Sequence, residues 1–292
     1  MNKEQKSNHW VVLLFVIPGL LPIILFWIVP MLLSLWISFT DWNYISPTYN
    51  FVGFDNYLSL ADNTDFIQAF VNTIQFSIFT IIPTLILGFL IALILDAHLI
   101  GKKFLRGLIF TPYVTPIVAI AIVWSYIFSP TGVLNKVLSF VGIEGVNWLT
   151  DSNTAMWAII IFTVWSGTGW TMMFYFDAFQ QIPPSLFEAA DIAGASFWHK
   201  IKTIYIPLVS PTTIYLVIIL TINAIQAYDQ INVMTQGGPS GSTRTMLYYY
   251  YQLAFEFFDM GQATAVAVLL LIISAVLSGI SLWVSKKYVY YR

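Results

Sequence analysis

Two stretches of this sequence combine hydrogen-bonding and aromatic side chains inside long runs that carry no charge. The first contains Trp165, Ser166, Gly167, Thr168, Gly169 and Trp170. In the second, Asn223 and Gln226 are three residues apart, so a helix places them on one face beside Ala227. Amides and hydroxyls can hold the OH groups of a sugar-like solute, while rings stack on its CH faces. The alternative is that the small residues only let helices pack closely. Further candidates for solute contact are Asn72, Tyr113 and Trp124.

Residue patterns for catalysis or metal binding are missing. The histidines, His9, His98 and His199, are far apart, and the sequence has no cysteine. There is no G-x-x-x-x-G-K-[ST] phosphate loop, no G-x-S-x-G or H-E-x-x-H motif, and no pair of carboxylates set for acid–base chemistry. We therefore expect no enzyme activity, no metal and no cofactor, with any ATP hydrolysis in a separate subunit.

The composition indicates a chain that lies mostly in lipid. Hydrophobic residues make up 58% of it and charged residues only 9%, against roughly a quarter charged in soluble proteins. Because about 20 apolar residues cross a bilayer as a helix, we searched for uncharged runs of that length. Six occur, at residues 10–40, 66–95, 107–135, 152–176, 203–228 and 260–285. These runs predict an all-α membrane domain over residues 10–285.

Basic residues predict the orientation of these six helices, because Lys and Arg favour the cytoplasmic side of short loops. One side holds Lys3, Lys6, Lys102, Lys103, Arg106, Lys200, Lys202, Lys286, Lys287 and Arg292, and the other only Lys136 and Arg244. Residues 1–9 and 286–292 are therefore expected to be cytoplasmic tails. The first run is about twice as long as the apolar part of a secretory signal. We expect it to be a retained helix, kinked or bounded by Pro18, Pro22 and Pro30.

The six runs contain none of the 14 acidic residues and none of the basic ones. A charge in hydrocarbon is costly and usually marks a proton or ion pathway. Its absence argues against a carrier driven by protons or sodium, although sodium can also be held by carbonyl groups alone. The energy source is therefore expected in a partner.

Residues 180–207, on the predicted cytoplasmic side, have the pattern of a short helix with defined ends. Ser185 and Glu188 form a possible capping box after two prolines. Gly194 suits a left-handed C-terminal cap, and Ser196 can cap a second segment that leads to Pro207. Such caps alone indicate only that a helix starts and ends here.

The spacing in this loop adds a more specific signal, because it resembles the signature loop of the membrane subunits of ABC importers. The residues that match are Glu188, Ala189, Ala190, Gly194, Ile204, Ile206 and Pro207, with Ile206 in place of the usual leucine. The resemblance implies a coupling helix that docks on an ATPase subunit. The residues that it implies for coupling are Glu188, Ala189, Ala190, Asp191, Gly194, Ile204 and Pro207.

Further motifs resemble the first permease subunit of the maltose and glycerol-3-phosphate type of sugar importers. They are Phe51-Val52-Gly53-Phe54-Asp55-Asn56-Tyr57, Asn72-Thr73, Pro112-Tyr113 through Trp124, Phe128-Ser129-Pro130 to Gly132, Thr235-Gln236-Gly237-Gly238-Pro239 with Ser242-Thr243, and Gly261-Gln262-Ala263. The resemblance implies the transmembrane fold of type I ABC importers in a bacterial cytoplasmic (inner) membrane. It also implies a second homologous permease, two cytoplasmic ATPase subunits and an extracytoplasmic solute-binding protein as partners.

The function expected from this resemblance is ATP-driven import of a sugar, with this chain forming half of the pore. The candidate pathway residues are Ser166, Gly167, Trp170, Asn223, Gln226 and Ala227. Because no basic residue lies in the runs, a neutral oligosaccharide is favoured. The alternatives are a permease for glycerol-3-phosphate or another polyol-type solute, a stand-alone secondary carrier, and a membrane scaffold without transport.

Overall fold

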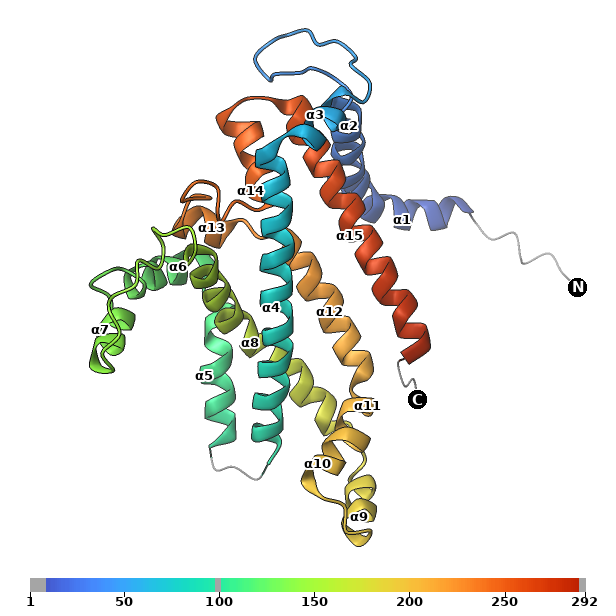
Figure 1. The fold of residues 1–292 in the computed structure, drawn as a ribbon. Coiled ribbons are helices and arrows are strands. Elements are labelled where there is room, and N and C mark those ends of the chain that lie inside the picture. Colours follow the sequence, from blue (N-terminus) through green and yellow to red (C-terminus); the bar gives the residue numbers. More distant parts are fainter. Residues whose placement is uncertain (1–8, 98–100, 289–292) are drawn as a thin grey trace, which may run out of the picture. The chain divides into compact units, whose positions relative to one another are not determined.

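The computed structural model describes residues 9–97 and 101–288, and within them every regular element is a helix (Figure 1). The chain divides into two compact units. The first comprises Met1–Asp62 with Tyr250–Leu269, and the second comprises Asn63–Tyr249 with Leu270–Arg292. Most residues of both tails, including Lys3, Lys6 and Arg292, lie outside the described residues, as does His98.

The first predicted membrane helix is present in the first unit but is not regular. It consists of α1 (His9–Ile23), a π-helical turn (Ile24–Ile28) and α2 (Val29–Ile37). Proline has no N–H to donate and its ring crowds the carbonyl one turn earlier. The π turn lies between Pro22, inside α1, and Pro30, at the start of α2. The expected prolines therefore mark where the helical geometry changes.

The end of α2 is held by a helix from the following loop, α3 (Asp55–Asp62). The side-chain amide of Asn56 donates to the carbonyl oxygens of Ser38 at 2.9 Å and Thr40 at 2.8 Å. These carbonyls follow the end of α2 and have no partner within it, so the amide satisfies them. Gly261, near the start of α15 (Met260–Tyr288), also lies against this point, because its backbone N–H donates to Trp42 O at 3.0 Å.

The second unit is built on α4 (Thr64–Asp96) and α8 (Ala155–Gln180), which pack against each other. α5 (Lys102–Val114) packs against α8, and α12 (Ser210–Ile225) packs against both α4 and α8. Glycines allow the closest approaches. A Cβ on Gly169 would lie 2.1 Å from the carbonyl oxygen of Ile109 in α5, and one on Gly88 would lie 2.5 Å from Cγ2 of Thr171. Small residues thus bring the helix backbones together, as is common in membrane proteins.

The prediction of a single third helix over residues 107–135 is wrong. Residues 102–127 form α5 and α6 (Ile117–Ile127), which meet at an angle of 97°, and α7 (Val133–Phe140) follows. Pro116 precedes α6, and Thr115 is extended (ψ 139°). A residue before proline avoids the helical region, so the chain turns here. Asn135, expected at the helix end, instead lies in α7 and accepts hydrogen bonds from Val146 N and Trp148 Nε1, both at 3.0 Å.

The fifth expected helix, over residues 203–228, is also broken. Its first part comprises α10 (Phe197–Lys200), a π turn (Ile201–Tyr205) and α11 (Ile206–Leu208). This part meets α12 at 65°, with prolines at 207 and 211 on either side of the bend. α12 ends at Ile225, and α13 (Asp229–Met234) follows, before α14 (Met246–Tyr251) and a π turn (Gln252–Glu256).

Among the described residues, four helices are long and apolar enough to cross a membrane: Phe15–Ile37, Thr64–Asp96, Ala155–Gln180 and Met260–Lys286. The two bent pairs, Lys102–Val114 with Ile117–Ile127 and Phe197–Leu208 with Ser210–Ile225, raise the number to six if each pair is one span. The six-span topology and the cytoplasmic position of both tails therefore stay predictions.

The junction around Gly261 gives a prediction about stability. A Cβ on Gly261 would lie 2.2 Å from the carbonyl oxygen of Thr40, so Gly261→Ala should force the backbone apart at a cost of about 1–3 kcal/mol. Gly279, in the same helix, has nothing within 4 Å of its Cβ position. Gly279→Ala should therefore be neutral or slightly stabilising. Thermal unfolding of the detergent-solubilised complex measures both, and equal melting temperatures for the two variants would contradict the proposed packing.

Candidate functional site

A cavity of about 390 Å³ opens in the second unit, lined by residues of α4, α5, α6, α8, α12 and α13. All six residues that the sequence proposed for a solute pathway line it: Ser166, Gly167, Trp170, Asn223, Gln226 and Ala227. They come from helices that are distant in sequence. The fold therefore brings together the two polar stretches that the sequence singled out.

Polar groups of the cavity come from the end of α12 and the start of α13. α12 stops at Ile225, so Gln226 and Ala227 lie where the backbone leaves the helix, and α13 begins at Asp229. The side chains of Asn223 and Gln226 are exposed, and neither forms a hydrogen bond with the described residues. Their amides are therefore free to bind a solute.

Aromatic rings form another part of the wall. Tyr113 of α5 stacks on Trp170 of α8, with ring centroids 5.7 Å apart and ring planes 25° apart. Phe174, one turn further along α8, packs on Trp170 at 4.6 Å. From α4, the buried hydroxyl residues Thr80 and Thr84 complete the lining. Rings next to hydroxyls and amides match the chemistry of a sugar, which has both CH faces and OH groups.

Other residues that the sequence singled out lie elsewhere. Trp124 packs on Trp165 at 5.0 Å, and both line a separate apolar groove of about 840 Å³. Thr168 donates its hydroxyl hydrogen to Val164 O of its own helix, and Gly169 packs against α5. Asn72 donates to backbone carbonyls of the 240–244 loop. One face of α8, with residues 163, 166, 167 and 170, lines the cavity.

Asp229 is a lining residue that the sequence analysis did not propose. It is exposed and forms no ion pair with the described residues. Among the described residues, no Lys, Arg or His lines the cavity. The only signal in the sequence was its position directly after the fifth uncharged run, where it counted as a loop residue.

The predicted cytoplasmic loop contains α9 (Pro184–Ile192). The expected capping box is wrong, because the helix begins at Pro184 and Pro183 takes the cap position with no side-chain hydrogen bond. A proline at the first helical position has no N–H that needs a cap. The other end is as expected. Gly194 is left-handed (φ 69°), and the N–H groups of Gly194 and Ala195 donate to Asp191 O and Ala190 O.

The segment after α9 ties this loop to the ends of α4 and α8. Ser196 Oγ accepts from His199 N at 3.3 Å, as predicted, and Lys200 forms an ion pair with Asp191. The hydroxyl of Tyr205 donates to Asp96 Oδ2 at 2.8 Å, and Gln180 Nε2 donates to Asp96 Oδ1 at 2.6 Å. α9 and α10 thus lie at the end of the second unit where α4 and α8 end (Figure 1).

The proposed coupling residues fall into two groups. Exposed are Glu188, Ala189, Asp191 and Gly194, whereas Ala190, Ile204 and Pro207 are buried or half-buried. Apolar residues that the sequence analysis did not propose for coupling are also exposed, most of all Ile192, at 90%, and Trp198, at 68%. The exposed residues form a surface with both apolar and acidic groups. Ala190, Ile204 and Pro207 pack beneath this surface, toward the interior of the unit.

Comparison with known proteins identifies the family. Residues 84–290 match the model of the binding-protein-dependent transport system inner membrane component. The trehalose/maltose transport system permease protein MalF of Thermococcus litoralis is 34% identical, covering 91% of this chain and 89% of the relative. The sn-glycerol-3-phosphate transport system permease protein UgpA of Escherichia coli (strain UTI89) is 30% identical, covering 93% of this chain and 92% of the relative.

A solved structure shares the fold. It is a bacterial ABC transporter involved in the import of the acidic polysaccharide alginate, 24% identical, with a TM-score of 0.84 and coverage of 95% of this chain and 96% of that one. The all-helical membrane fold and the ABC permease family that the sequence predicted are confirmed. The chain belongs to the family of binding-protein-dependent transport system inner membrane components, which are permease subunits whose ATPase activity resides in separate subunits.

Proposed function

We propose that this chain forms half of the translocation pore of an ATP-driven importer and passes a neutral oligosaccharide. The observation that carries the proposal is the cavity, which combines the free amides of Asn223 and Gln226 with the stacked rings of Tyr113 and Trp170. A second, homologous permease would supply the other wall. An external binding protein would deliver the solute.

The charge of the cavity favours a neutral solute. The relatives carry trehalose and maltose in one case and glycerol-3-phosphate in the other, so their names leave the charge open. In the described part of this chain, the lining contains Asp229 and no basic residue. At about 5 Å and an effective dielectric constant of about 20, a negative group on the solute would be repelled by roughly 3 kcal/mol. Glycerol-3-phosphate, the alternative solute, is therefore disfavoured.

Contacts between α9 and the end of α4 would transmit a movement of an ATPase subunit to the cavity. The ring of Phe187 in α9 packs on Tyr205 at 5.1 Å between centroids, and Tyr205 bonds Asp96 at the end of α4. α4 and α8 carry Thr84, Ser166 and Trp170 to the cavity wall. Because helices are stiff, a displacement of α9 would move both walls. Glu188, Ala189, Asp191 and Gly194 would then form the contact with the ATPase.

The proposed topology agrees with this arrangement. We propose six spans within residues 10–285, with residues 1–9 and 286–292 on the cytoplasmic side. Ten of the twelve basic residues then face the cytoplasm, together with the loop over residues 180–207. The six long apolar runs of the sequence contain no Asp, Glu, Lys or Arg, and this disfavours a stand-alone ion-coupled carrier.

The cavity gives a prediction about transport. Trp170→Ala should lower ATP-driven uptake of maltotriose into proteoliposomes at least about tenfold, because a stacking surface of the solute site is lost. Trp165→Ala is the matched control, since Trp165 is in the same helix but lines the separate groove. Uptake should remain within about twofold for the control. Equal loss in both variants would show that the cavity has no special role.

The loop surface gives a prediction about assembly. Ile192→Asp places a charge on an exposed apolar side chain that we propose is covered by the ATPase subunit, so affinity for that subunit should fall about tenfold or more. Val141→Asp is the control, because Val141 is 71% exposed and lies in the loop after α7. Co-purification of the ATPase subunits measures the effect. Retention of the ATPase by Ile192→Asp at the native level would refute docking at α9.

A further inference from the structure

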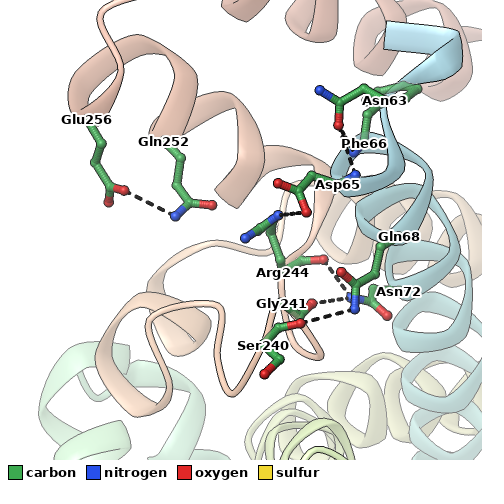
Figure 2. A network of polar contacts seen from close by, with 10 residues as sticks. All are labelled: Asn63, Asp65, Phe66, Gln68, Asn72, Ser240, Gly241, Arg244, Gln252 and Glu256. Carbon is green, nitrogen blue, oxygen red and sulfur yellow. Dashed lines mark hydrogen bonds and ion pairs between the residues drawn. The ribbon is translucent and has the colours of Figure 1, made fainter.

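Two motifs that lie about 170 residues apart in the sequence meet in the second unit, outside the cavity. Figure 2 shows Asn72 of α4 beside the loop over residues 240–244. The Nδ2 group of Asn72 donates to Gly241 O at 2.8 Å and to Arg244 O at 3.0 Å. Asn72 is buried, with 8% of its surface exposed. Both side-chain N–H groups of Asn72 donate hydrogen bonds to this loop, so neither is available to a solute.

An ion pair and a glycine complete the attachment, which we call the loop clamp. Arg244 Nη1 lies 2.9 Å from Asp65 Oδ1 in the first turn of α4 (Figure 2). Gly241 has φ 75°, and a Cβ there would lie 2.7 Å from Oε1 of Gln68. The left-handed backbone conformation, and not this close approach, favours glycine here, because the end of the flexible Gln68 side chain could move away at little cost. The clamp therefore comprises Asp65, Asn72, Gly241 and Arg244.

The residue after the clamp reaches the cavity wall. Thr245 is fully buried, and its Oγ1 donates to Ala227 O at 2.8 Å. On its other side, Met246 N donates to Thr73 Oγ1 at 2.8 Å, and Thr73 Oγ1 donates to Ala69 O in α4 at 2.7 Å. Thr245 is thus held between two attachments to α4, one on each side in sequence.

The carbonyl group of Ala227 lies where the backbone has left α12 and lacks a helical hydrogen-bond partner. α12 ends at Ile225, so Ala227 O is not satisfied by the regular hydrogen bonds of that helix. A buried carbonyl without a partner is costly in protein or lipid. The hydroxyl of Thr245 satisfies it and fixes the backbone between Gln226 and Asp229, both of which line the cavity.

We propose that the loop clamp and Thr245 position the part of the cavity wall formed by Gln226, Ala227 and Asp229. Asn72 and Thr245 are then positioning residues, which act on the solute only through this wall. The inference rests on the proposed function insofar as the wall contacts a solute. The positioning itself is a property of the chain that can be measured without transport.

The test uses spin labels, because the sequence has no cysteine of its own. Labels at Ile82→Cys, on the exposed side of α4, and Gln226→Cys report the distance between α4 and the wall. They are measured in the purified complex with the cysteines of partner subunits replaced. Thr245→Val, which cannot donate to Ala227 O, should broaden the distance distribution, whereas Thr245→Ser should restore the native one.

A matched control separates positioning from general loss of a buried hydroxyl. Thr168→Val removes a hydroxyl that is also buried but bonds only its own helix, at Val164 O, so it should leave the distribution unchanged. If Thr245→Val does not assemble, Asn72→Asp replaces it, because a carboxylate cannot donate to Gly241 O and Arg244 O. A native distribution in the variant that assembles would overturn the proposal.

Transport gives the second measurement and distinguishes the two proposals. Without the labels, Thr245→Val should lower ATP-driven uptake of maltotriose about 3- to 10-fold, the loss expected for one hydrogen bond, and Thr245→Ser should recover it. If the labels respond as expected but the native complex shows no ATP-driven uptake, the proposed function fails and the positioning stands. If the distance distribution does not change in the variant but the native complex takes up maltotriose, the positioning proposal fails and the proposed function stands.

Discussion

The constraint on which this structure depends is that backbone N–H and C=O groups inside a membrane protein must find partners within the protein. Regular helices meet it by themselves, but this chain repeatedly leaves the helical path. At the end of α2, the amide of Asn56 bonds the carbonyls of Ser38 and Thr40. After α12, the hydroxyl of Thr245 bonds Ala227 O. Neutral side chains thus satisfy the backbone at these two breaks.

These breaks are also where the polar surface of the cavity arises. A continuous helix through residues 223–230 would keep Asn223 and Gln226 on one face but turn Asp229 about 120° away from Asn223. Because α12 stops at Ile225 and α13 starts at Asp229, all three line one cavity. The bend at Thr115-Pro116 similarly directs α6 away from α5, and Tyr113, just before the bend, stacks on Trp170. Two of the helix breaks therefore lie at the site that we propose for the solute.

The cavity and the loop around α9 differ in chemistry, in line with the different tasks that we propose for them. The cavity offers amides, hydroxyls and rings, which suit weak and reversible contact with a hydroxyl-rich solute. The loop presents exposed Ile192 and Glu188 above a buried support that includes Ile204 and the Tyr205–Asp96 hydrogen bond. We propose that attachment to α4 and α8 lets the loop surface act on the cavity. ATPase activity resides in separate subunits.

The sequence by itself determined the membrane class, the family and the two stretches that meet in the cavity, because uncharged length and motif spacing are properties of the linear chain. It also predicted the left-handed cap at Gly194, since only glycine adopts that conformation at little cost. Tertiary structure decided where helices break, and it assigned Trp165 and Trp170 of one helix to different surfaces. It also made Asn72 a partner of a distant loop, and it brought Asp229 to the cavity. These outcomes depend on which backbone groups lack partners and which distant side chains reach them, and that is fixed only when the helices pack.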